Sequence, residues 1–326
     1  RMVQMPFARS RVPRAKHISS AGFLSLVMNN PERPTTRLRN LILADPILVI
    51  PVVHDPLCAR IAEQAGFSAI FSAGYANSAA LLGRPDVGLL TLTEMVDCAA
   101  RIVDATTIPV FADGDTGYGN VTNVGRTISL YERAGVGGVF IEDQVSPKRC
   151  GHMEGKALIR PEEMEAKVRA AVDARKDPDL VIMARTDAIA VNGIEDAIER
   201  ANLYFEAGAD LTFVEAPESV EQMRRICREV EGPSFANILP GGKTPVLSAS
   251  ELEAIGYAVV ADPVSCTYAI AKTVQFVLSE LKRTGSPASY TDRLMGFDEF
   301  NRLVGLEEIR EKECSYYRNS SHNARG

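Results

Sequence analysis

The sequence predicts an α/β protein folded as a (β/α)8 barrel, and three observations support this fold class. Eight short apolar or β-branched runs alternate with longer amphipathic stretches of helical period, which is the pattern of repeated βα units. Glycine follows several of the helical stretches just before the next run. The 326 residues, 46% of them hydrophobic, can form one barrel of about 250 residues with terminal extensions. A doubly wound parallel sheet is the alternative fold.

In chain order, the expected strands cover 47–52, 69–73, 109–113, 138–142, 180–184, 211–215, 234–238 and 257–261. Helical period is clearest over 94–105, 123–134, 194–207 and 220–230. Gly135, Gly208 and Gly256 mark expected helix ends. We expect 267–283 to follow the last strand as its helix and 297–317 to form one further amphipathic helix outside the barrel.

Three regions are expected along the chain. Residues 1–39 form a basic leader or transit-like segment, residues 40–290 the barrel, and residues 291–326 a helical extension. Translation from Met28 is an alternative interpretation of the leader. The first forty residues carry eight Lys/Arg and one Glu, a net +7, so the remaining residues carry −13 of the total of −6. An acidic folded part disfavours nucleic acid and membrane partners.

Cysteine usage and hydropathy bear on the compartment. The six cysteines contain no CxxC pair, which favours reduced thiols in the cytoplasm, with the mitochondrial matrix as the alternative if the leader is a transit peptide. No segment approaches the roughly 18 apolar residues that a membrane span requires. A small-molecule enzyme of the cell interior fits these features.

Polar residues lie at the carboxyl ends of the expected strands. The functional prediction rests on this position. A buried strand should be apolar, so a polar residue at its carboxyl end costs folding energy unless it has a role there. In a barrel these ends meet at one rim, where barrel enzymes hold their active sites. The residues are Asp113, Asp115, Glu142, Arg185, Glu215, Asn237 and Ser265.

Asp113, Asp115 and Glu142 offer only oxygen ligands from neighbouring strands. This donor set favours a hard cation, and Mg²⁺ is expected, with Mn²⁺ as a possible substitute. Asp86 is a further candidate ligand. Zinc is not expected, because the four histidines form no pair at ligand spacing and no Cys/His cluster supplies three or four ligands.

The segment after the fourth strand surrounds a thiol with cations. Lys148, Arg149 and His152 flank Cys150 in a loop that contains Gly151. Such neighbours lower the pKa of a thiol and allow proton exchange with a substrate near neutrality, an effect that contributes roughly 10² to 10⁴ in rate. Cys150 is therefore the expected catalytic acid/base. A solvated basic loop with an incidental cysteine is the alternative.

Two glycine-containing turns are further candidates for substrate contacts. The turn of Ser72, Ala73, Gly74 and Tyr75 can present backbone N–H groups to a carboxylate, or it can be a plain tight turn. The segment 241–244 lacks the spacing of a phosphate-binding loop and is interpreted as a gate over the rim or as a turn.

Together these motifs resemble the isocitrate lyase/phosphoenolpyruvate mutase superfamily over roughly residues 40–317. The resemblance rests on KRCGH at 148–152, DGDTG at 113–117, IEDQ at 141–144 and ARTDA at 184–188. It implies a (β/α)8 barrel, a Mg²⁺ site on Asp113, Asp115 and Glu142, and a mobile loop bearing Cys150. It also implies a homotetramer whose C-terminal helices are exchanged between neighbours.

The cysteine loop resembles the carbon–carbon lyase branch, since members that act on phosphonates generally lack it. The implied reaction removes the proton of a 2-hydroxyl, breaks the C2–C3 bond of a di- or tricarboxylate to give a 2-oxo acid, and protonates the other product from Cys150. Lys148, Arg149 and His152 would stabilise charge on that product. Arg185, Glu215, Asn237 and Ser265 would hold carboxylate and hydroxyl groups.

Departures from the family pattern bear on the substrate. Tyr268 stands where 2-methylisocitrate lyases place an arginine, and 237–242 also differs from theirs, which disfavours a tricarboxylate. The chain is more similar to the petal death protein and 2,3-dimethylmalate lyase group, so a 2-alkylmalate is expected. Oxaloacetate hydrolysis, with Ser265 on the 2-oxo group, is the alternative. Phe71 replaces a tyrosine suggested as the base, which leaves the base open, and a non-catalytic barrel or a phosphonomutase are further alternatives.

Overall fold

Eight parallel strands form one nearly closed barrel in the computed structural model, which describes residues 32–151 and 153–322, the side chains of 318–322 excepted. The hydrogen-bonded strand order is β1-β8-β7-β6-β5-β4-β3-β2, and a bridge between Val52 and Phe71 joins β1 to β2. The (β/α)8 prediction is confirmed. A doubly wound sheet is excluded, because β1 contacts both β8 and β2. The strands are β1 Leu48–Pro51, β2 Ile70–Ser72, β3 Val110–Asp113, β4 Gly138–Glu142, β5 Val181–Thr186, β6 Leu211–Val214, β7 Ser234–Asn237 and β8 Val259–Asp262.

Strand β5 is longer than expected at its carboxyl end. The prediction ended this strand at residue 184 because a charged residue follows, but Arg185 remains in the ladder and pairs in register with Glu142 of β4. Its guanidinium can be buried there because Asp187 accepts two of its hydrogen bonds. The extension places Arg185 directly beside the carboxylates of β3 and β4.

The barrel interior below the rim is packed with aromatic rings. Phe71, Phe111, Phe140, Phe213 and Phe235 belong to one buried cluster. The Phe71 ring meets three of the others edge-on, with centroids 5.5, 5.7 and 6.0 Å away. The floor under the rim is therefore apolar and of low dielectric.

Helix α2, Pro34–Leu43, packs at the amino-terminal ends of the strands. Leu38 is fully buried in the same cluster as the interior rings, and Arg39 pairs with Asp210 at the start of β6. The leader expected over 1–39 is thus wrong for 34–39, whose apolar stripe the barrel buries. The rest of that prediction, residues 1–31, lies outside the described residues.

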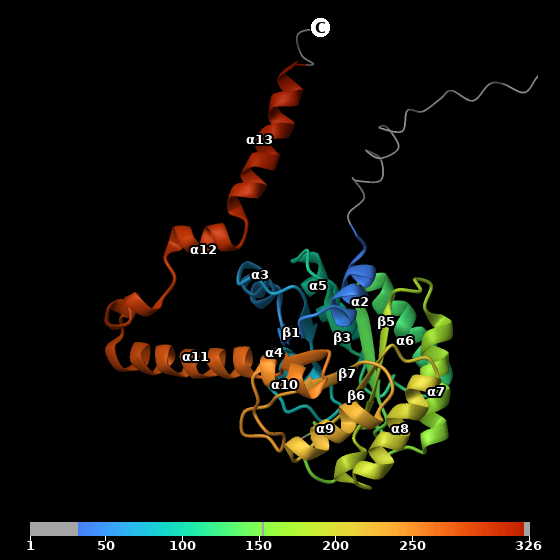
Figure 1. The fold of residues 1–326 in the computed structure, drawn as a ribbon. Helices are drawn as coiled ribbons and strands as arrows, with labels where there is room; N and C mark the ends of the chain where they lie inside the picture. Colours follow the sequence, from blue (N-terminus) through green and yellow to red (C-terminus); the bar gives the residue numbers. More distant parts are fainter. Residues whose placement is uncertain (1–31, 152, 323–326) are drawn as a thin grey trace, which may run out of the picture. The chain divides into compact units, whose positions relative to one another are not determined.

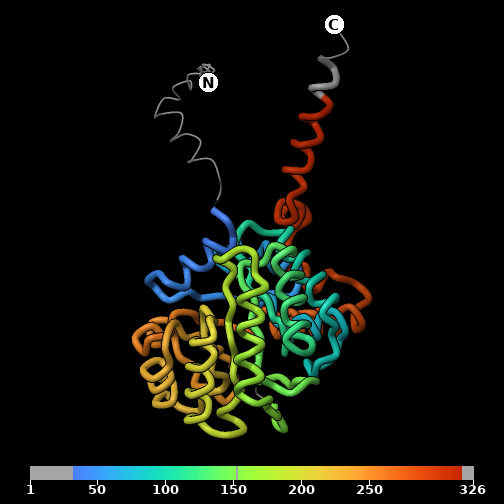
Figure 2. The backbone as a smooth tube through the Cα atoms, turned by 90° about the vertical axis from the view of Figure 1, so that its right-hand side faces the viewer, coloured from blue at the N-terminus to red at the C-terminus, as the bar shows by residue number. Residues whose placement is uncertain are grey.

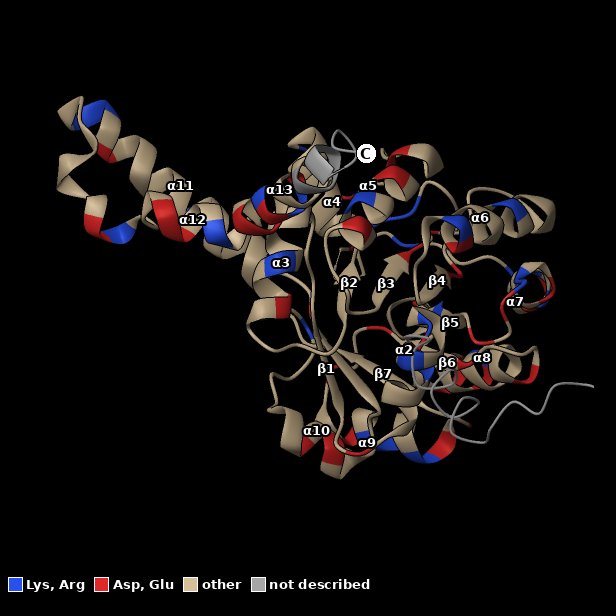
Figure 3. Cartoon of the chain, turned by 90° about the horizontal axis from the view of Figure 1, so that it is seen from above, with Lys and Arg blue, Asp and Glu red and all other residues tan. Residues whose placement is uncertain are grey.

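The outer helices follow the strands in order around the barrel (Figures 1 and 2). Gly135, Gly208 and Gly256 all have positive φ after helix ends, as expected. Charged residues of both signs are spread over these helices (Figure 3). The helices are α3 Pro56–Gln64, α4 Gly74–Leu82, α5 Leu92–Asp104, α6 Val121–Ala134, α7 Pro161–Ala174, α8 Ile194–Glu206, α9 Val220–Glu229 and α10 Ala249–Ile255.

Three helices end the described chain: α11 Ser265–Thr284, α12 Phe297–Leu303 and α13 Leu306–His322. The single helix expected over 297–317 is wrong, because Gly305 adopts φ +79° and breaks it in two. No residue of α11 is buried, although the helix after β8 should cover β8 and β1. Val49 of β1 is correspondingly 38% exposed. Among the described residues, no helix combines the length and apolarity of a membrane span.

Candidate active site

Four carboxylates converge on one ammonium group at the carboxyl ends of β3 and β4. Asp113 ends β3, Glu142 ends β4, and Asp86 reaches the same point from the segment after α4. Lys148 Nζ lies 2.7 Å from Asp86 Oδ2 and 2.9 Å from Asp115 Oδ1. All five side chains are buried. The structure thus brings the expected metal ligands together, with Lys148 among them.

The turn after β2 supports this cluster. Gly74 N–H donates to Asp113 Oδ2 at 2.7 Å, and Asp115 N–H donates to Asp113 Oδ1 at 2.9 Å. A Cβ on Gly74 would lie 2.8 Å from Asp113 Oδ2, so only glycine fits. The N–H group expected to meet a substrate carboxylate therefore binds a protein carboxylate instead.

The cluster fits a hard divalent cation. Both carboxylate oxygens of Glu142 are buried and accept no hydrogen bond within the described part of the chain. Burial raises the pKa of Glu142 well above its ordinary value and that of Asp113 to about 6, although Lys148 lowers both. One ammonium leaves the four carboxylates with excess negative charge. An all-oxygen donor set with unsatisfied carboxylate oxygens is the kind that Mg²⁺ binds.

Arg185 occupies the neighbouring position on β5. It donates from Nε and Nη2 to the two oxygens of Asp187, at 2.9 and 3.1 Å, and its Nε lies 3.5 Å from Glu142 Oε2. Its guanidinium carbon lies 5.1 Å from the ring centre of Phe213. Burial would raise the pKa of Asp187, but Arg185 and Lys156 outweigh it and lower that pKa to about 2. Asp187 is therefore a permanent counter-ion that orients Arg185.

The loop that carries Cys150 is anchored at both ends. Arg149 N–H donates to Gln144 Oε1 at 3.0 Å, and Gln144 Nε2 donates back to the Arg149 carbonyl at 2.8 Å. Beyond the cysteine, Lys156 Nζ donates to the Gly151 carbonyl and, at 2.8 Å, to Asp187 Oδ1. These contacts hold the loop against the end of β5.

Gly151 permits the closest approach of this loop to the rim. A Cβ at this position would lie 2.4 Å from Arg185 Nη2 and 2.5 Å from Glu215 Oε1. The loop backbone therefore lies directly on the two polar groups expected to bind the substrate, and Cys150 is held beside them.

A cavity of about 240 Å³ opens between this loop and the aromatic floor. Its polar half contains Asp86, Asp113, Lys148, Cys150 and Arg185. Of the other predicted residues, Ala73, Tyr75, Gly151, Glu215 and Asn237 also line it. The remaining lining is mainly apolar or aromatic and includes Val52, Phe71, Phe140, Met153, Phe213, Phe235, Leu239, Val264 and Tyr268.

Three predicted site residues lie elsewhere. Ser72 accepts a hydrogen bond from Asn77 and does not line the cavity, because Phe71 takes the inward position of β2. Arg149 is exposed and donates to the Glu154 carbonyl. Ser265 is exposed at the start of α11. His152 lies outside the described residues.

Tyr75 and Tyr268 close one side of the cavity. Their hydroxyls lie 3.1 Å apart, and this hydrogen bond, with burial, raises the pKa of Tyr75 to about 12. Tyr75 therefore stays protonated at neutral pH, and either hydroxyl of the pair can donate to the other. Tyr268 stands at the position where the sequence comparison predicts an arginine in 2-methylisocitrate lyases. In this chain it contributes a hydroxyl to the cavity wall.

Lys156 and the aromatic floor were not predicted from the sequence. Lys156 lies in a loop whose sequence has no distinguishing motif. Its role in anchoring the loop becomes visible only from its ion pair with Asp187 in the structure. The floor had a readable signal, since phenylalanines 71, 111, 140, 213 and 235 all fall within expected strands.

Comparison with known proteins identifies the family. The family model of phosphoenolpyruvate phosphomutase matches residues 38–282. The 2,3-dimethylmalate lyase of Eubacterium barkeri is 47% identical over 280 residues, which are 86% of this chain and 97% of that protein. The chain belongs to the PEP mutase/isocitrate lyase superfamily. The predicted membership is confirmed.

Two solved structures of this superfamily match the fold closely. A crystal structure of 2,3-dimethylmalate lyase has a TM-score of 0.83 at 35% identity, covering 87% of this chain and 95% of that one. Phosphonopyruvate hydrolase in complex with oxalate and Mg²⁺ has a TM-score of 0.79 at 29% identity, covering 87% and 99%. A divalent metal therefore belongs to the chemistry of this superfamily.

Proposed function

We propose that this superfamily member is a Mg²⁺-dependent carbon–carbon lyase that cleaves a 2-alkylmalate into a 2-oxo acid and a carboxylic acid. The observation that carries the proposal is the position of Cys150: its loop is anchored to β5, and its thiol lines the same cavity as Asp113 and Arg185. A thiol in that place is a proton donor for carbon. Reactions that transfer or release a phosphoryl group do not require a proton donor to carbon.

The proposed reaction is balanced in protons and electrons. A base takes the proton of the 2-hydroxyl, and the C–O bond becomes a carbonyl as the C2–C3 bond breaks. The electron pair of that bond moves onto C3, next to its carboxyl group. Cys150 then delivers its thiol proton to C3, which releases the second acid.

Two charged groups of the chain position the substrate for this cleavage. Arg185, held in one orientation by Asp187, suits a carboxylate of the substrate. Lys148 provides the cation of the carboxylate cluster and faces the same cavity. The anchored loop lines the cavity beside these groups, where it would limit access of water to the carbanion before the thiol protonates it.

The resident metal is proposed to be Mg²⁺, with Mn²⁺ as a substitute. Asp86, Asp113, Asp115 and Glu142 would hold it, directly or through water. When bound, it would supply positive charge that stabilises oxygen anions of the substrate.

The cavity wall favours an alkyl-substituted dicarboxylate. Apart from Lys148, which pairs with Asp86 and Asp115, and Arg185, which pairs with Asp187, its lining is uncharged or acidic. Tyr268 offers a hydroxyl where a third carboxylate would need a cation. Oxaloacetate hydrolysis was the alternative predicted from the sequence because Ser265 could contact the 2-oxo group. Ser265 does not line the cavity, so that support is lost.

A substrate panel with Mg²⁺ tests the proposal. 2,3-Dimethylmalate, 2-ethyl-3-methylmalate, 2-methylisocitrate, oxaloacetate and phosphonopyruvate are compared by detecting the 2-oxo acid, oxalate or phosphate released. We expect the alkylmalates to be cleaved with the highest kcat/KM and EDTA to abolish turnover. Oxalate from oxaloacetate as the main activity, or phosphate release from phosphonopyruvate, would contradict the proposal.

We also propose that the chain assembles as a homotetramer in which α11 packs on a neighbouring barrel. Support comes from the uncovered wall at β1, where Val49 is exposed, and from the exposed apolar side chains of α11 at Val274, Leu278 and Leu281. Leu278→Asp should reduce the mass measured by light scattering, whereas Glu280→Asp on the same helix should not. A wild-type protein that has the mass of a monomer by light scattering would refute this assembly.

A reducing compartment, the cytoplasm or the mitochondrial matrix, completes the proposal. All six cysteines lie in the described part of the chain and are free thiols. Fractionation of the native source, with the mature amino terminus determined by mass spectrometry, separates the two compartments.

A further inference from the structure

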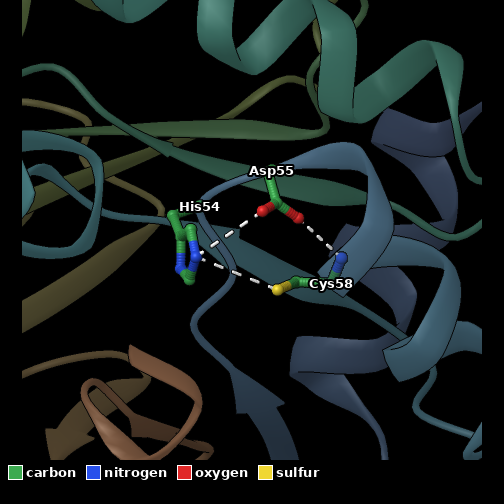
Figure 4. A group of neighbouring side chains, drawn as sticks. All are labelled: His54, Asp55 and Cys58. Atoms are coloured by element: carbon green, nitrogen blue, oxygen red, sulfur yellow. Dashed lines mark hydrogen bonds and ion pairs between the residues drawn. The ribbon is translucent and has the colours of Figure 1, made fainter. Parts of the chain in front are cut away.

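A second set of potential metal ligands lies outside the cavity, in the segment that joins β1 to α3. His54, Asp55 and Cys58 each offer one ligand atom, and the three atoms lie within 4.8 Å of one another (Figure 4). His54 Nε2 is 3.6 Å from Asp55 Oδ2 and 4.0 Å from Cys58 Sγ. None of the three lines the cavity of Cys150.

The geometry distinguishes a metal site from a nucleophilic triad. A Cys–His–Asp triad needs the thiol on one ring nitrogen and the carboxylate on the other. Here both partners face the same nitrogen, Nε2, so the three ligand atoms enclose one point. Zn²⁺ bond lengths place the ligand atoms of a tetrahedral site roughly 3.4–3.6 Å apart. The two distances from His54 Nε2, 3.6 and 4.0 Å, lie within about half an ångström of that spacing.

The three ligand atoms face one another, and burial together with the Asp55 carboxylate raises the pKa of the Cys58 thiol to about 12, so a bound ion must displace its proton. Asp55 caps α3 with Oδ1, which accepts the Cys58 N–H at 2.7 Å, so Oδ2 is the oxygen that faces His54. Thr267 Oγ1 lies 3.5 Å from His54 Nδ1, on the far side of the ring. A partner on the second nitrogen is the arrangement that fixes the ring of a metal-binding histidine.

An ion can reach the group from solvent. Asp55 is 43% exposed, while His54 and Cys58 are buried. A surface cavity of about 340 Å³ opens onto His54 and Asp55, and Glu94, Asp97 and Arg101 also line it. Arg101 pairs with Asp97 at 2.9 Å, so Asp55 and Glu94 are the carboxylates that favour a cation at this opening.

We propose that His54, Asp55 and Cys58 bind Zn²⁺, or a similar borderline transition metal ion, at a site separate from the Mg²⁺ site. A set of nitrogen, sulfur and oxygen ligands selects Zn²⁺ over Mg²⁺, which takes oxygen ligands. Water supplies the fourth ligand at the exposed side. The ion releases the thiol proton of Cys58 on binding.

The position suggests a structural consequence. Thr267 belongs to α11, so an ion on His54 links the β1–α3 segment to the start of the helix that leaves the barrel. Zinc would thus stabilise the base of α11, while the catalytic residues remain untouched.

Cobalt titration of the full-length, metal-stripped protein tests the site. Excess Mg²⁺ first fills the carboxylate cluster, and Co²⁺ is then added. We expect one equivalent to give the near-ultraviolet charge-transfer band of a thiolate–Co²⁺ bond, and Zn²⁺ to displace it. Cys58→Ser should abolish the band, whereas Cys150→Ser should retain it. Wild-type protein without the band, or a band that survives Cys58→Ser, would overturn the proposal.

Two further variants separate ligand loss from misfolding. Asp55→Asn keeps an oxygen to cap α3 but loses the ligand charge, and His54→Gln removes the ring nitrogen. Each should weaken Zn²⁺ binding by more than the roughly 10- to 100-fold that follows loss of an outer-shell partner. Their circular dichroism and lyase turnover should match the wild type. Zn²⁺ affinity unchanged in both folded variants would also refute the site.

Discussion

Lys156 provides the sharpest test of how the catalytic loop is held. Its side chain is only 2% exposed, and its ammonium binds both the Gly151 carbonyl and Asp187. Lys156→Met keeps the length and the apolar stem but removes the charge. We expect lower stability and slower turnover, because the loop that carries Cys150 loses its anchor to β5.

The stability loss can be worked out from the Asp187 pKa. Arg185 and Lys156 lower that pKa from 3.8 to about 2 against the effect of burial. A difference of nearly two units corresponds to about 2 kcal/mol at neutral pH, shared between two cations. Arg185 keeps its two hydrogen bonds, so about 1 kcal/mol is lost there, and the stranded Gly151 carbonyl adds roughly 1–3 kcal/mol. Lys156→Met should therefore cost roughly 2–4 kcal/mol.

The pH dependence has a definite sign. Because the folded-state pKa of Asp187 is below its unfolded value, its contribution is fully present above pH 4 and is lost as the pH falls toward 2. Urea unfolding at pH 7 and pH 3 should show the gap between wild type and Lys156→Met narrowing at the lower pH. A gap that widens on acidification would contradict the ion-pair assignment.

A matched variant at the opposite end of the barrel serves as the control. Arg175 pairs with Asp210 before β6, and both side chains are 15% exposed. Arg175→Met should also lower stability but leave kcat unchanged at a temperature where the protein is folded. Wild-type kcat in folded Lys156→Met would refute the proposed role of the anchor.

Three further outcomes are expected. Cys150→Ser should lower kcat by roughly 10² to 10⁴ while calorimetry shows unchanged substrate affinity, because only the proton donor is altered. Glu142→Gln should weaken Mg²⁺ binding at least about tenfold, measured by the Mg²⁺ dependence of thermal unfolding, since a buried carboxylate without hydrogen bonds becomes neutral. Leu38→Ala should cost roughly 2–5 kcal/mol in urea unfolding, because Leu38 is fully buried where α2 meets the barrel interior.

Strand-end chemistry was predictable from sequence because it follows from topology. Once eight parallel strands are assigned, the residues after β3 and β4 must meet at one rim, and Asp113, Asp115 and Glu142 do so. The break between α12 and α13 was not predictable in the same way. The apolar period continues through Gly305, and only its positive φ interrupts the helix.

Side-chain direction inside loops was the part that sequence could not provide. The pattern around Cys150 suggested three cations near one thiol, yet neighbouring residues of an extended loop point to opposite sides. Lys148 turns inward to the carboxylates, whereas Arg149 turns outward to the Glu154 carbonyl. For the same reason Ser72 faces Asn77 while Phe71 faces the cavity. The alternation of side chains along an extended segment predicts that neighbours point to opposite sides. It does not predict which of the two residues faces the cavity.

The apolar half of the cavity decides which substrates the polar half can use. Each methyl group buried against Phe71, Phe213 or Phe235 gains about 0.8 kcal/mol, close to fourfold in affinity. A carboxylate placed there would lose its hydration without a cation to replace it, a larger cost of several kcal/mol. Lys148 and Arg185 cannot serve a third carboxylate, because they are the groups proposed to position the dicarboxylate and they also pair with protein carboxylates. The same rim chemistry, set above this floor, therefore selects alkyl substituents over a third acid group.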